Sequence, residues 1–130
     1  MALVDAPCSG LGTLRRNPDL KWRMTAERIA MLTQQQREIL AAAARCVKPG
    51  GRLVYATCSP LAVETVDIVD GFLDAHPGFR RVSTADVLEQ QRIDLPPDWR
   101  AYTGQGDLLL WPHRTGTDGF YAAVMVRGDL

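Results

Sequence analysis

The chain has 130 residues, of which 46% are hydrophobic and 23% charged, and its 15 basic and 15 acidic residues cancel. This composition is typical of one soluble globular domain, and no apolar stretch approaches the roughly 20 residues of a membrane-spanning helix. Zero net charge argues against a surface that binds nucleic acid over its whole area, so such contacts must come from a local patch or from a region outside this chain. The three cysteines lack the spacing of zinc or redox pairs, and no signal peptide is visible, which favours a reducing cytoplasm.

The first part of the chain predicts a strand, a loop and a long helix. Residues 2–6 form an apolar run typical of a short buried strand, and residues 10–24, rich in Gly, Pro and charge, indicate a loop. Thr25 can cap a helix whose first turn carries Glu27. The apolar face of this helix recurs at helical spacing and comprises Ile29, Leu32, Gln36, Ile39, Leu40, Ala43 and Val47. The Lys-Pro-Gly-Gly sequence at 48–51 ends the helix and turns the chain.

The rest of the chain predicts a second strand at 52–57 and a second helix at about 62–75. Three further segments have the composition of strands: 79–83, 108–111 and 119–127. Residues 85–106 contain two prolines and two glycines and predict a long surface loop with one helical turn. The order strand, helix, strand, helix and then several strands predicts an α/β fold, a parallel sheet with an antiparallel C-terminal edge.

Two cysteines each follow an apolar strand and are surrounded by small residues. Cys8 lies in Leu-Val-Asp-Ala-Pro-Cys-Ser-Gly, and Cys58 lies in Tyr-Ala-Thr-Cys-Ser-Pro. Because carboxyl ends of parallel strands meet at one edge of a sheet, we expect both thiols there. A free cysteine can also be simply a small, buried hydrophobic residue, and we interpret Cys46 on the first helix in this way. For Cys8, nearby Asp5 argues against that interpretation, because an acid at the end of an apolar strand is costly unless it meets a ligand or hydrogen-bond donors.

The loop after Cys8 is strongly basic and contains an aromatic residue. Four cations lie within nine residues around Trp22, namely Arg15, Arg16, Lys21 and Arg23. Such a run is often only a solvated loop, but its origin at the strand that carries Cys8 favours a patch that binds phosphates and bases. His113 and Asp118 have no spacing that supports a metal site or a catalytic triad, and the glycines at 10 and 12 are too weak a signal for a dinucleotide site.

Together these motifs resemble those of the Sun/Fmu/RsmB family of RNA cytosine-5 methyltransferases. The resemblance includes Gly-Thr-Leu-Arg-Arg-Asn-Pro-Asp-Leu-Lys-Trp at 12–22, Trp-Pro-His at 111–113 and Asp-Gly-Phe-Tyr-Ala at 118–122, and so covers nearly the whole chain. After Thr-Cys-Ser the family usually continues with an acidic pair and Asn, whereas this chain keeps a single acid, Glu64.

The resemblance implies a role for each motif. Cys58 is the expected nucleophile, Cys8 is expected to assist release of the methylated product, and Asp5 is expected to stabilise the activated base and to border the methyl donor, S-adenosylmethionine. Addition of a thiolate to carbon-6 of cytosine would activate carbon-5 for methylation. A reactive thiolate needs a lowered pKa, so we expect positive charge or donors near Cys58. Ribosomal RNA is the implied substrate, with Arg15, Arg16, Lys21 and Trp22 as the RNA-binding candidates.

The resemblance also implies that the cofactor-binding half of the domain is absent from residues 1–130. We therefore expect the C-terminal part of a single methyltransferase domain, a partial Rossmann-like sheet in which residues 119–127 lie beside 52–57. Such a chain is expected to be inactive alone and to form a homo-oligomer through an exposed sheet edge or face.

Two other functions remain open from the residues. One is a non-catalytic fragment that binds RNA or another partner. The other is a thiol hydrolase, which requires a histidine base, and neither His76 nor His113 lies in a motif that would deliver one.

Overall fold

The computed structural model describes residues 1–13, 16, 18–19, 24–97, 102–111 and 118–128. A five-stranded sheet has the order β1-β2-β5-β3, with β4 pairing β5 off this path. The strands are β1 (Ala2–Asp5), β2 (Arg52–Thr57), β3 (Phe79–Val82), β4 (Leu108–Leu110) and β5 (Phe120–Arg127). The α-helices are α2 (Ala26–Ala44), α3 (Val66–Ala75) and α4 (Thr84–Gln90), and two 3-10 turns are η1 (Leu11–Thr13) and η2 (Ala62–Glu64).

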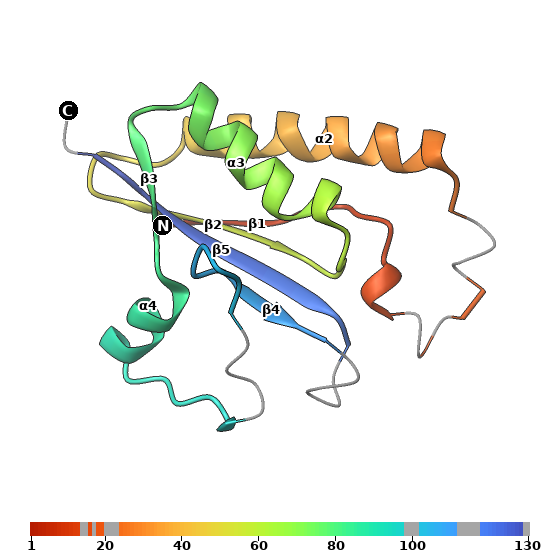
Figure 1. Cartoon of the computed structure of the whole chain (residues 1–130). Coiled ribbons are helices and arrows are strands. Elements are labelled where there is room, and N and C mark those ends of the chain that lie inside the picture. Colours follow the sequence, from red (N-terminus) through yellow and green to blue (C-terminus); the bar gives the residue numbers. More distant parts are fainter. Residues whose placement is uncertain (14–15, 17, 20–23, 98–101, 112–117, 129–130) are drawn as a thin grey trace.

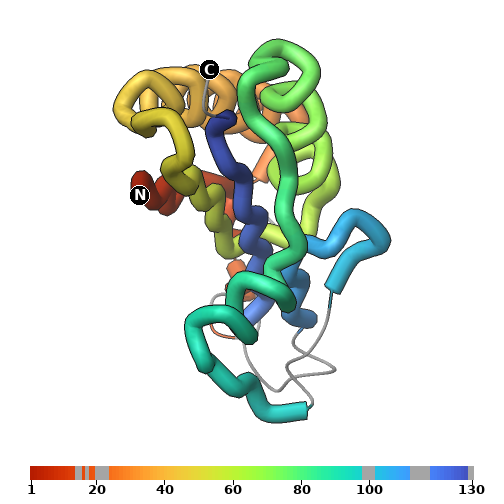
Figure 2. The backbone as a smooth tube through the Cα atoms, turned by 90° about the vertical axis from the view of Figure 1, so that its left-hand side faces the viewer, coloured from red at the N-terminus to blue at the C-terminus, as the bar shows by residue number. Residues whose placement is uncertain are grey.

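The helices lie in two places relative to the sheet. Helices α2 and α3 run side by side over one face of the sheet (Figures 1 and 2). Strand β3 connects α3 to α4, which lies on the opposite side of the sheet. Thr25 caps α2 as expected, because its side chain accepts a hydrogen bond from the Arg28 amide at 3.1 Å. None of the helices in the described ranges is both long and apolar enough to cross a bilayer.

The sheet has the mixed topology that the sequence predicts. Strands β1 and β2 are parallel, with Asp5 opposite Ala56, so the loops that carry Cys8 and Cys58 leave the same edge. Strand β5 is antiparallel to β2 and lies beside it, which confirms the predicted position of residues 119–127. The other edge of β5 is shared, since its C-terminal part pairs β3 and its N-terminal part pairs β4. The fold class is therefore the predicted α/β sheet with an antiparallel C-terminal part.

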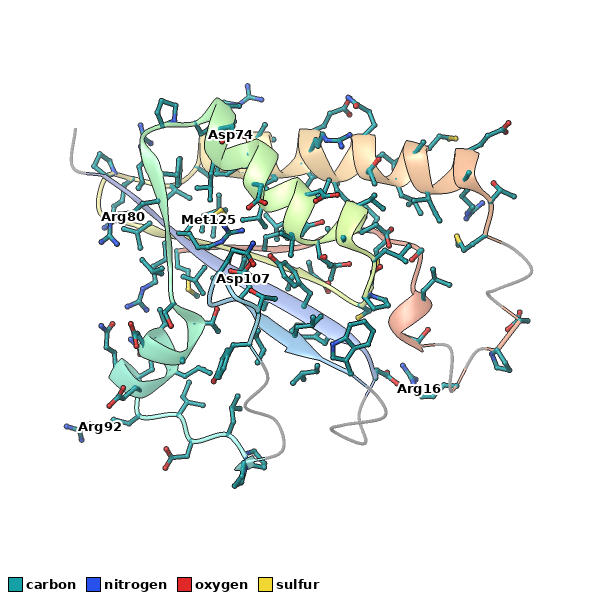
Figure 3. All side chains as sticks on the ribbon, in the orientation of Figure 1. Arg16, Asp74, Arg80, Arg92, Asp107 and Met125 are labelled. Carbon is teal, nitrogen blue, oxygen red and sulfur yellow. The ribbon has the colours of Figure 1, made fainter. Side chains whose placement is uncertain are left out.

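The hydrophobic core fills the space between the sheet and the helices α2 and α3. Alternate residues of β5 are fully buried there, including Met125, which lies at the centre of the molecule, whereas Asp74, Arg80 and Arg92 point outward (Figure 3). The other core side chains include Leu40, Leu53, Tyr55, Ile68, Val69 and Tyr121. Alternation on β5 arises because successive side chains of a strand point to opposite faces.

Several local predictions differ from the structure. Ile39, expected on the apolar face of the first helix, is exposed. The helix expected at 62–75 is divided into η2 and α3 at Thr65, whose backbone is not helical. Part of the loop expected at 85–106 is the regular helix α4, capped by the Ser83 side chain. Cys46, expected in the core, is exposed, because the face of α2 that meets the sheet carries Gln36, Leu40 and Ala44 instead.

Candidate active site at the ends of two parallel strands

The two predicted thiols lie together at the carboxyl ends of β1 and β2. Cys8 and Cys58 are both partly exposed and free of disulfides. Cys58 is close enough to Cys8 and to Asp5 to interact with both electrostatically. Asp5 itself is exposed at the last position of β1. The sequence therefore predicted correctly that these residues gather at one edge of the sheet.

A fully buried carboxylate, that of Glu64 in η2, joins the two cysteine loops. Its Oε1 accepts a hydrogen bond from the Ser9 amide at 2.7 Å, and its Oε2 accepts one from the Ser9 hydroxyl at 2.7 Å. The Ser59 hydroxyl also donates to Oε2. Since Ser9 follows Cys8 and Ser59 follows Cys58, one side chain contacts the residue next to each thiol.

Two neighbours hold Glu64 from outside the cysteine loops. The amide Nε2 of Gln36, on α2, donates to the Pro7 carbonyl at 2.8 Å and to Glu64 Oε1 at 3.3 Å. The Tyr55 hydroxyl, on β2, donates to the backbone carbonyl of Glu64 at 2.8 Å. Burial and the negative charges of Glu64 and Cys8 raise the pKa of Tyr55, so that its hydroxyl remains a donor. Helix α2 thus contacts the carboxylate of Glu64, and strand β2 holds the backbone of the same residue.

A close backbone contact joins three segments beside Cys58. The amide of Gly12 donates to the Cys58 carbonyl at 2.8 Å, and the amide of Gly119 donates to the Gly12 carbonyl at 2.6 Å. A Cβ on Gly12 would lie 2.5 Å from the Cys58 carbonyl oxygen and still closer to that of Gly119. Only glycine fits between these carbonyls, so the glycine that the sequence offered as a weak dinucleotide signal has a packing role.

An ion pair lies beside the Cys58 thiol. The Arg16 guanidinium donates to both carboxylate oxygens of Asp118, with Nε at 3.1 Å and Nη2 at 2.6 Å. Burial raises the pKa of Cys58, and Cys8, Asp5 and Asp118 raise it further, whereas Arg16 lowers it. The expected lowering of this pKa is therefore wrong for this structure, because desolvation and three acidic neighbours outweigh one exposed cation. Asp118, interpreted as structural from the sequence, belongs to the site.

Most of the predicted RNA-binding patch cannot be placed. Arg15, Lys21 and Trp22 lie outside the residues that the structure describes, as does His113. Arg16 is described, and its side chain is exposed beside Cys58. Of the four candidates, Arg16 is thus the one that the structure brings to the thiols.

A second buried polar cluster was not anticipated from the sequence. Asp107, fully buried before β4, accepts a hydrogen bond from the Tyr121 hydroxyl and lies 3.2 Å from Arg81 Nε. Arg81 also contacts Asp70 of α3 at 2.9 Å. Burial raises the pKa of Asp107, against the opposing effects of Tyr121 and Arg81. This cluster joins β3, β4, β5 and α3 and includes neither cysteine.

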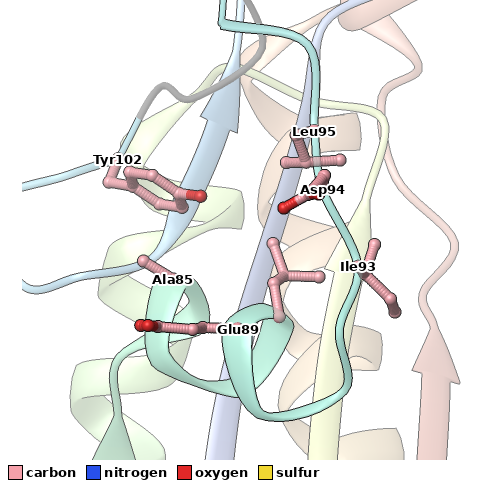
Figure 4. Close-up of a pocket in the computed structure, with 7 residues that line it drawn as sticks. Ala85, Glu89, Ile93, Asp94, Leu95 and Tyr102 are labelled. Atoms are coloured by element: carbon pink, nitrogen blue, oxygen red, sulfur yellow. The ribbon is translucent and has the colours of Figure 1, made fainter.

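A surface pocket of about 340 Å³ lies elsewhere, against α4. Its walls come from α4, from residues 93–95 and from Tyr102, with Glu89 and Asp94 among the lining residues (Figure 4). It shares no residue with the two cysteine motifs. Among the described residues, the two cysteine motifs therefore lie at the edge of the sheet, away from this pocket.

Comparisons with known proteins identify relatives that match this chain over nearly its whole length. The family model described as 16S rRNA methyltransferase RsmB/F matches residues 1–126. The ribosomal RNA small subunit methyltransferase B of Vibrio vulnificus is 41% identical over 125 residues, 96% of this chain and 25% of that protein. A Mycobacterium tuberculosis protein named "Putative methyltransferase" is 44% identical over 126 residues, 96% of this chain and 26% of that protein.

Solved structures agree with these relatives. The crystal structure of PH0851 is 40% identical and superposes with a TM-score of 0.80 over 95% of this chain and 25% of its own. NSun6 from Pyrococcus horikoshii, solved with SFG, is 25% identical with a TM-score of 0.70 over 98% of this chain and 29% of its own. This chain thus spans about a quarter of the length of the curated relatives it matches. It belongs to the RsmB/F family of 16S rRNA methyltransferases.

Proposed function

We propose that this chain is the thiol-bearing, C-terminal part of a methyltransferase domain that methylates carbon-5 of cytosine in ribosomal RNA. The observation that carries the proposal is the meeting of Cys8, Cys58 and Asp5 at one edge of the sheet. The family names RNA of the small ribosomal subunit as the class of substrate. Two thiols and a carboxylate are more than simple binding of RNA requires, which favours catalysis over a purely binding role.

The thiol of Cys58 is the proposed nucleophile. Its sulfur, as the thiolate, bonds to carbon-6 of the cytosine, and the electron pair of the carbon-5–carbon-6 bond becomes available at carbon-5. After carbon-5 has been methylated, a base removes its proton, the double bond reforms and the Cys58 thiolate leaves. Asp5, at the end of β1, is proposed to stabilise the charge that develops on the ring through a hydrogen bond between its carboxyl group and nitrogen-3 that shares one proton.

Cys8 is proposed to act in release of the methylated base and not in the first addition. It lies beside Cys58 and is partly exposed, so it can approach the adduct without displacing the nucleophile. Exposed Arg16, with Arg15, Lys21 and Trp22, is proposed to bind the RNA beside the thiols.

The residues present fit one wall of a cofactor site. S-adenosylmethionine would supply the methyl group. Asp5 is exposed at the carboxyl end of a parallel strand, where an acid suits a ligand that carries hydroxyl and amino groups. We propose that the remaining walls come from a preceding half of the domain. Residues 1–130 alone then bind the cofactor weakly and transfer no methyl group, which isothermal titration calorimetry can check.

Covalent capture tests the proposed function. The complete domain, obtained by joining this chain to the preceding half of a relative such as the Vibrio vulnificus enzyme, is incubated with S-adenosylmethionine and with ribosomal RNA that contains 5-fluorocytosine. Fluorine at carbon-5 blocks the final proton removal, so the protein should remain bonded to RNA, and mass spectrometry of its peptides should locate the bond on Cys58. A domain that binds the RNA without forming any adduct would support the non-catalytic alternative, and hydrolysis of a thioester substrate through either cysteine would support the hydrolase.

A further inference from the structure

The Glu64 carboxylate has no unused hydrogen-bonding capacity. Its Oε1 accepts from the Ser9 amide and from Gln36, and its Oε2 accepts from the hydroxyls of Ser9 and Ser59. A carboxylate has about four lone-pair sites, so these donors fill it. The side chain is also completely buried. It can neither take up a proton from a substrate nor touch one, and its effect must pass through the residues that it binds.

Both serines transmit this contact to the loops that follow the thiols. The Ser9 hydroxyl donates to Glu64 and also accepts from the Leu11 amide at 3.3 Å. The Ser59 hydroxyl does the same, accepting from the Leu61 amide at 3.2 Å. Each serine therefore closes a local turn directly after a cysteine. The two turns have equivalent bonding and share one acceptor.

We propose that Glu64 is a positioning residue that fixes the distance and orientation between the thiols of Cys8 and Cys58. The relative position of the two thiols has to be precise, because in the proposed reaction the thiol of Cys8 acts on an adduct formed by Cys58. Small misplacements of reacting groups lower reaction rates strongly. The assignment of roles to the thiols rests on the proposed function, whereas the geometric claim does not.

Glutamine is the informative replacement for Glu64 because it has almost the same shape. Its amide exchanges two acceptor sites for two N–H donors. An NH₂ group at the position of Oε2 would leave both serine hydroxyl protons without their acceptor. At the position of Oε1 it would face the N–H groups of Ser9 and Gln36, which are donors as well. Glu64→Gln should therefore disconnect the two loops while leaving the volume of the core unchanged.

Cross-linking of the isolated chain measures the relation between the thiols without RNA or cofactor. In a Cys46→Ser background, which removes the exposed third thiol, dibromobimane becomes fluorescent when both of its arms react and should bridge Cys8 to Cys58. Glu64→Gln should reduce the rate of bridging by about tenfold, since the second arm depends on the placement of its target. Glu89→Gln, an exposed glutamate on α4, is the matched control and should leave the rate unchanged.

Two serine variants separate positioning from general support of the fold, and remain informative if Glu64→Gln does not fold. Ser59→Ala should slow single-site alkylation of Cys58 or shift its pH profile, leaving Cys8 near the parent. Ser9→Ala should have the same effect on alkylation of Cys8 and leave Cys58 near the parent. Both variants should reduce the rate of bridging. A global loss of stability would instead alter both thiols equally and lower the unfolding temperature in proportion.

Several results would overturn the inference. These are no bridging in the Cys46→Ser parent, unchanged bridging in folded Glu64→Gln, or equal effects of either serine variant on both thiols. In the complete domain, parental rates of methyl transfer by Glu64→Gln would also overturn it, yet would leave the proposed function intact. Conversely, absence of any RNA adduct would defeat the proposed function without changing the cross-linking result.

Discussion

The reactivity of Cys58 depends on opposing charges that lie beside it. Burial and three acidic neighbours raise the pKa of its thiol, and Arg16 acts in the other direction. Arg16 is itself held by Asp118, so its positive charge is partly neutralised where the thiolate would form. The pKa of the thiol is consequently held above its usual value, which favours the protonated form.

Neutralising each member of the ion pair should shift the pKa of Cys58 in opposite directions. Arg16→Gln removes a positive charge that stabilises the thiolate, so the pKa should rise. Asp118→Asn removes a negative charge and leaves Arg16 unopposed, so the pKa should fall. The rate of iodoacetamide alkylation of Cys58 as a function of pH, followed by peptide mass spectrometry, measures both shifts. Shifts of the same sign would show that the ion pair acts through the loop conformation and not through its charges.

The two thiols should give different phenotypes when each is replaced in the complete domain. Cys58→Ser should abolish methyl transfer and adduct formation, because a hydroxyl is far less ionised than a thiol and a poorer nucleophile. Cys8→Ser should still form the adduct but release the methylated base slowly. The protein should therefore remain bonded even to RNA that contains no 5-fluorocytosine. Denaturing electrophoresis with labelled RNA distinguishes the two outcomes. Exchanged phenotypes would make Cys8 the nucleophile.

The turn η1 joins the two cysteine loops to the start of β5 through Gly12. Gly12→Ala would place a Cβ against two carbonyl oxygens, and overpacking of this kind costs about 1–3 kcal/mol of unfolding free energy. Gly71→Ala on α3 is the matched control, since its Cβ meets no atom within 4 Å and alanine favours a helix by about 1 kcal/mol over glycine. Urea denaturation should show the first variant destabilised and the second stabilised. Equal effects of the two substitutions on the unfolding free energy would mean that the backbone around Gly12 accommodates a Cβ without loss of stability.

Local pattern was sufficient to predict most elements and the meeting of the cysteines. Apolar runs indicate β1 and β2, and because parallel strands end at a common edge, their sequence alone predicts that Cys8 and Cys58 meet there. The prediction that β5 lies beside β2 came from resemblance to a family, because nothing in a strand's own residues names its neighbour. The break between η2 and α3 went undetected, since the apolar spacing continues through it.

The contacts that depend on residues distant in sequence could not be predicted. Glu64 was noted as the single acid after Thr-Cys-Ser, but its burial becomes visible once Ser9, which is 55 residues away, is placed against it. A serine directly after each cysteine was the available signal. The cluster of Asp107, Arg81 and Tyr121 offered no comparable signal, since its members have no common motif.

The exposed edge of the sheet should make the isolated chain self-associate. Strand β1 pairs β2 alone among the described strands, Leu3 on it is 65% exposed, and Met1 just before it is 84% exposed. Unpaired edge strands with apolar side chains tend to pair with other chains. We therefore predict a homodimer or larger assembly, which multi-angle light scattering at tens of micromolar can detect.

A charged substitution on that edge provides the control. Leu3→Lys places a charge on a side chain that the core does not use, and it should shift the assembly toward the monomer without lowering the unfolding temperature. A parent chain that is monomeric throughout the concentration range would contradict the prediction. Persistence of the assembly in Leu3→Lys would assign it to another surface.

The position of β5 also determines when the protein can fold. This strand comes late in the sequence, yet it lies between β2 and β3 and supplies the fully buried Tyr121, Ala123 and Met125. While the chain is being synthesised, β2 and β3 have no common partner until residues 120–127 have emerged. The core must then close by contacts between segments far apart in sequence, which are the slowest to form. A nascent chain that stalls before residue 120 would leave β3 and β4 without their strand partner and would expose apolar surfaces, and such species are prone to aggregate.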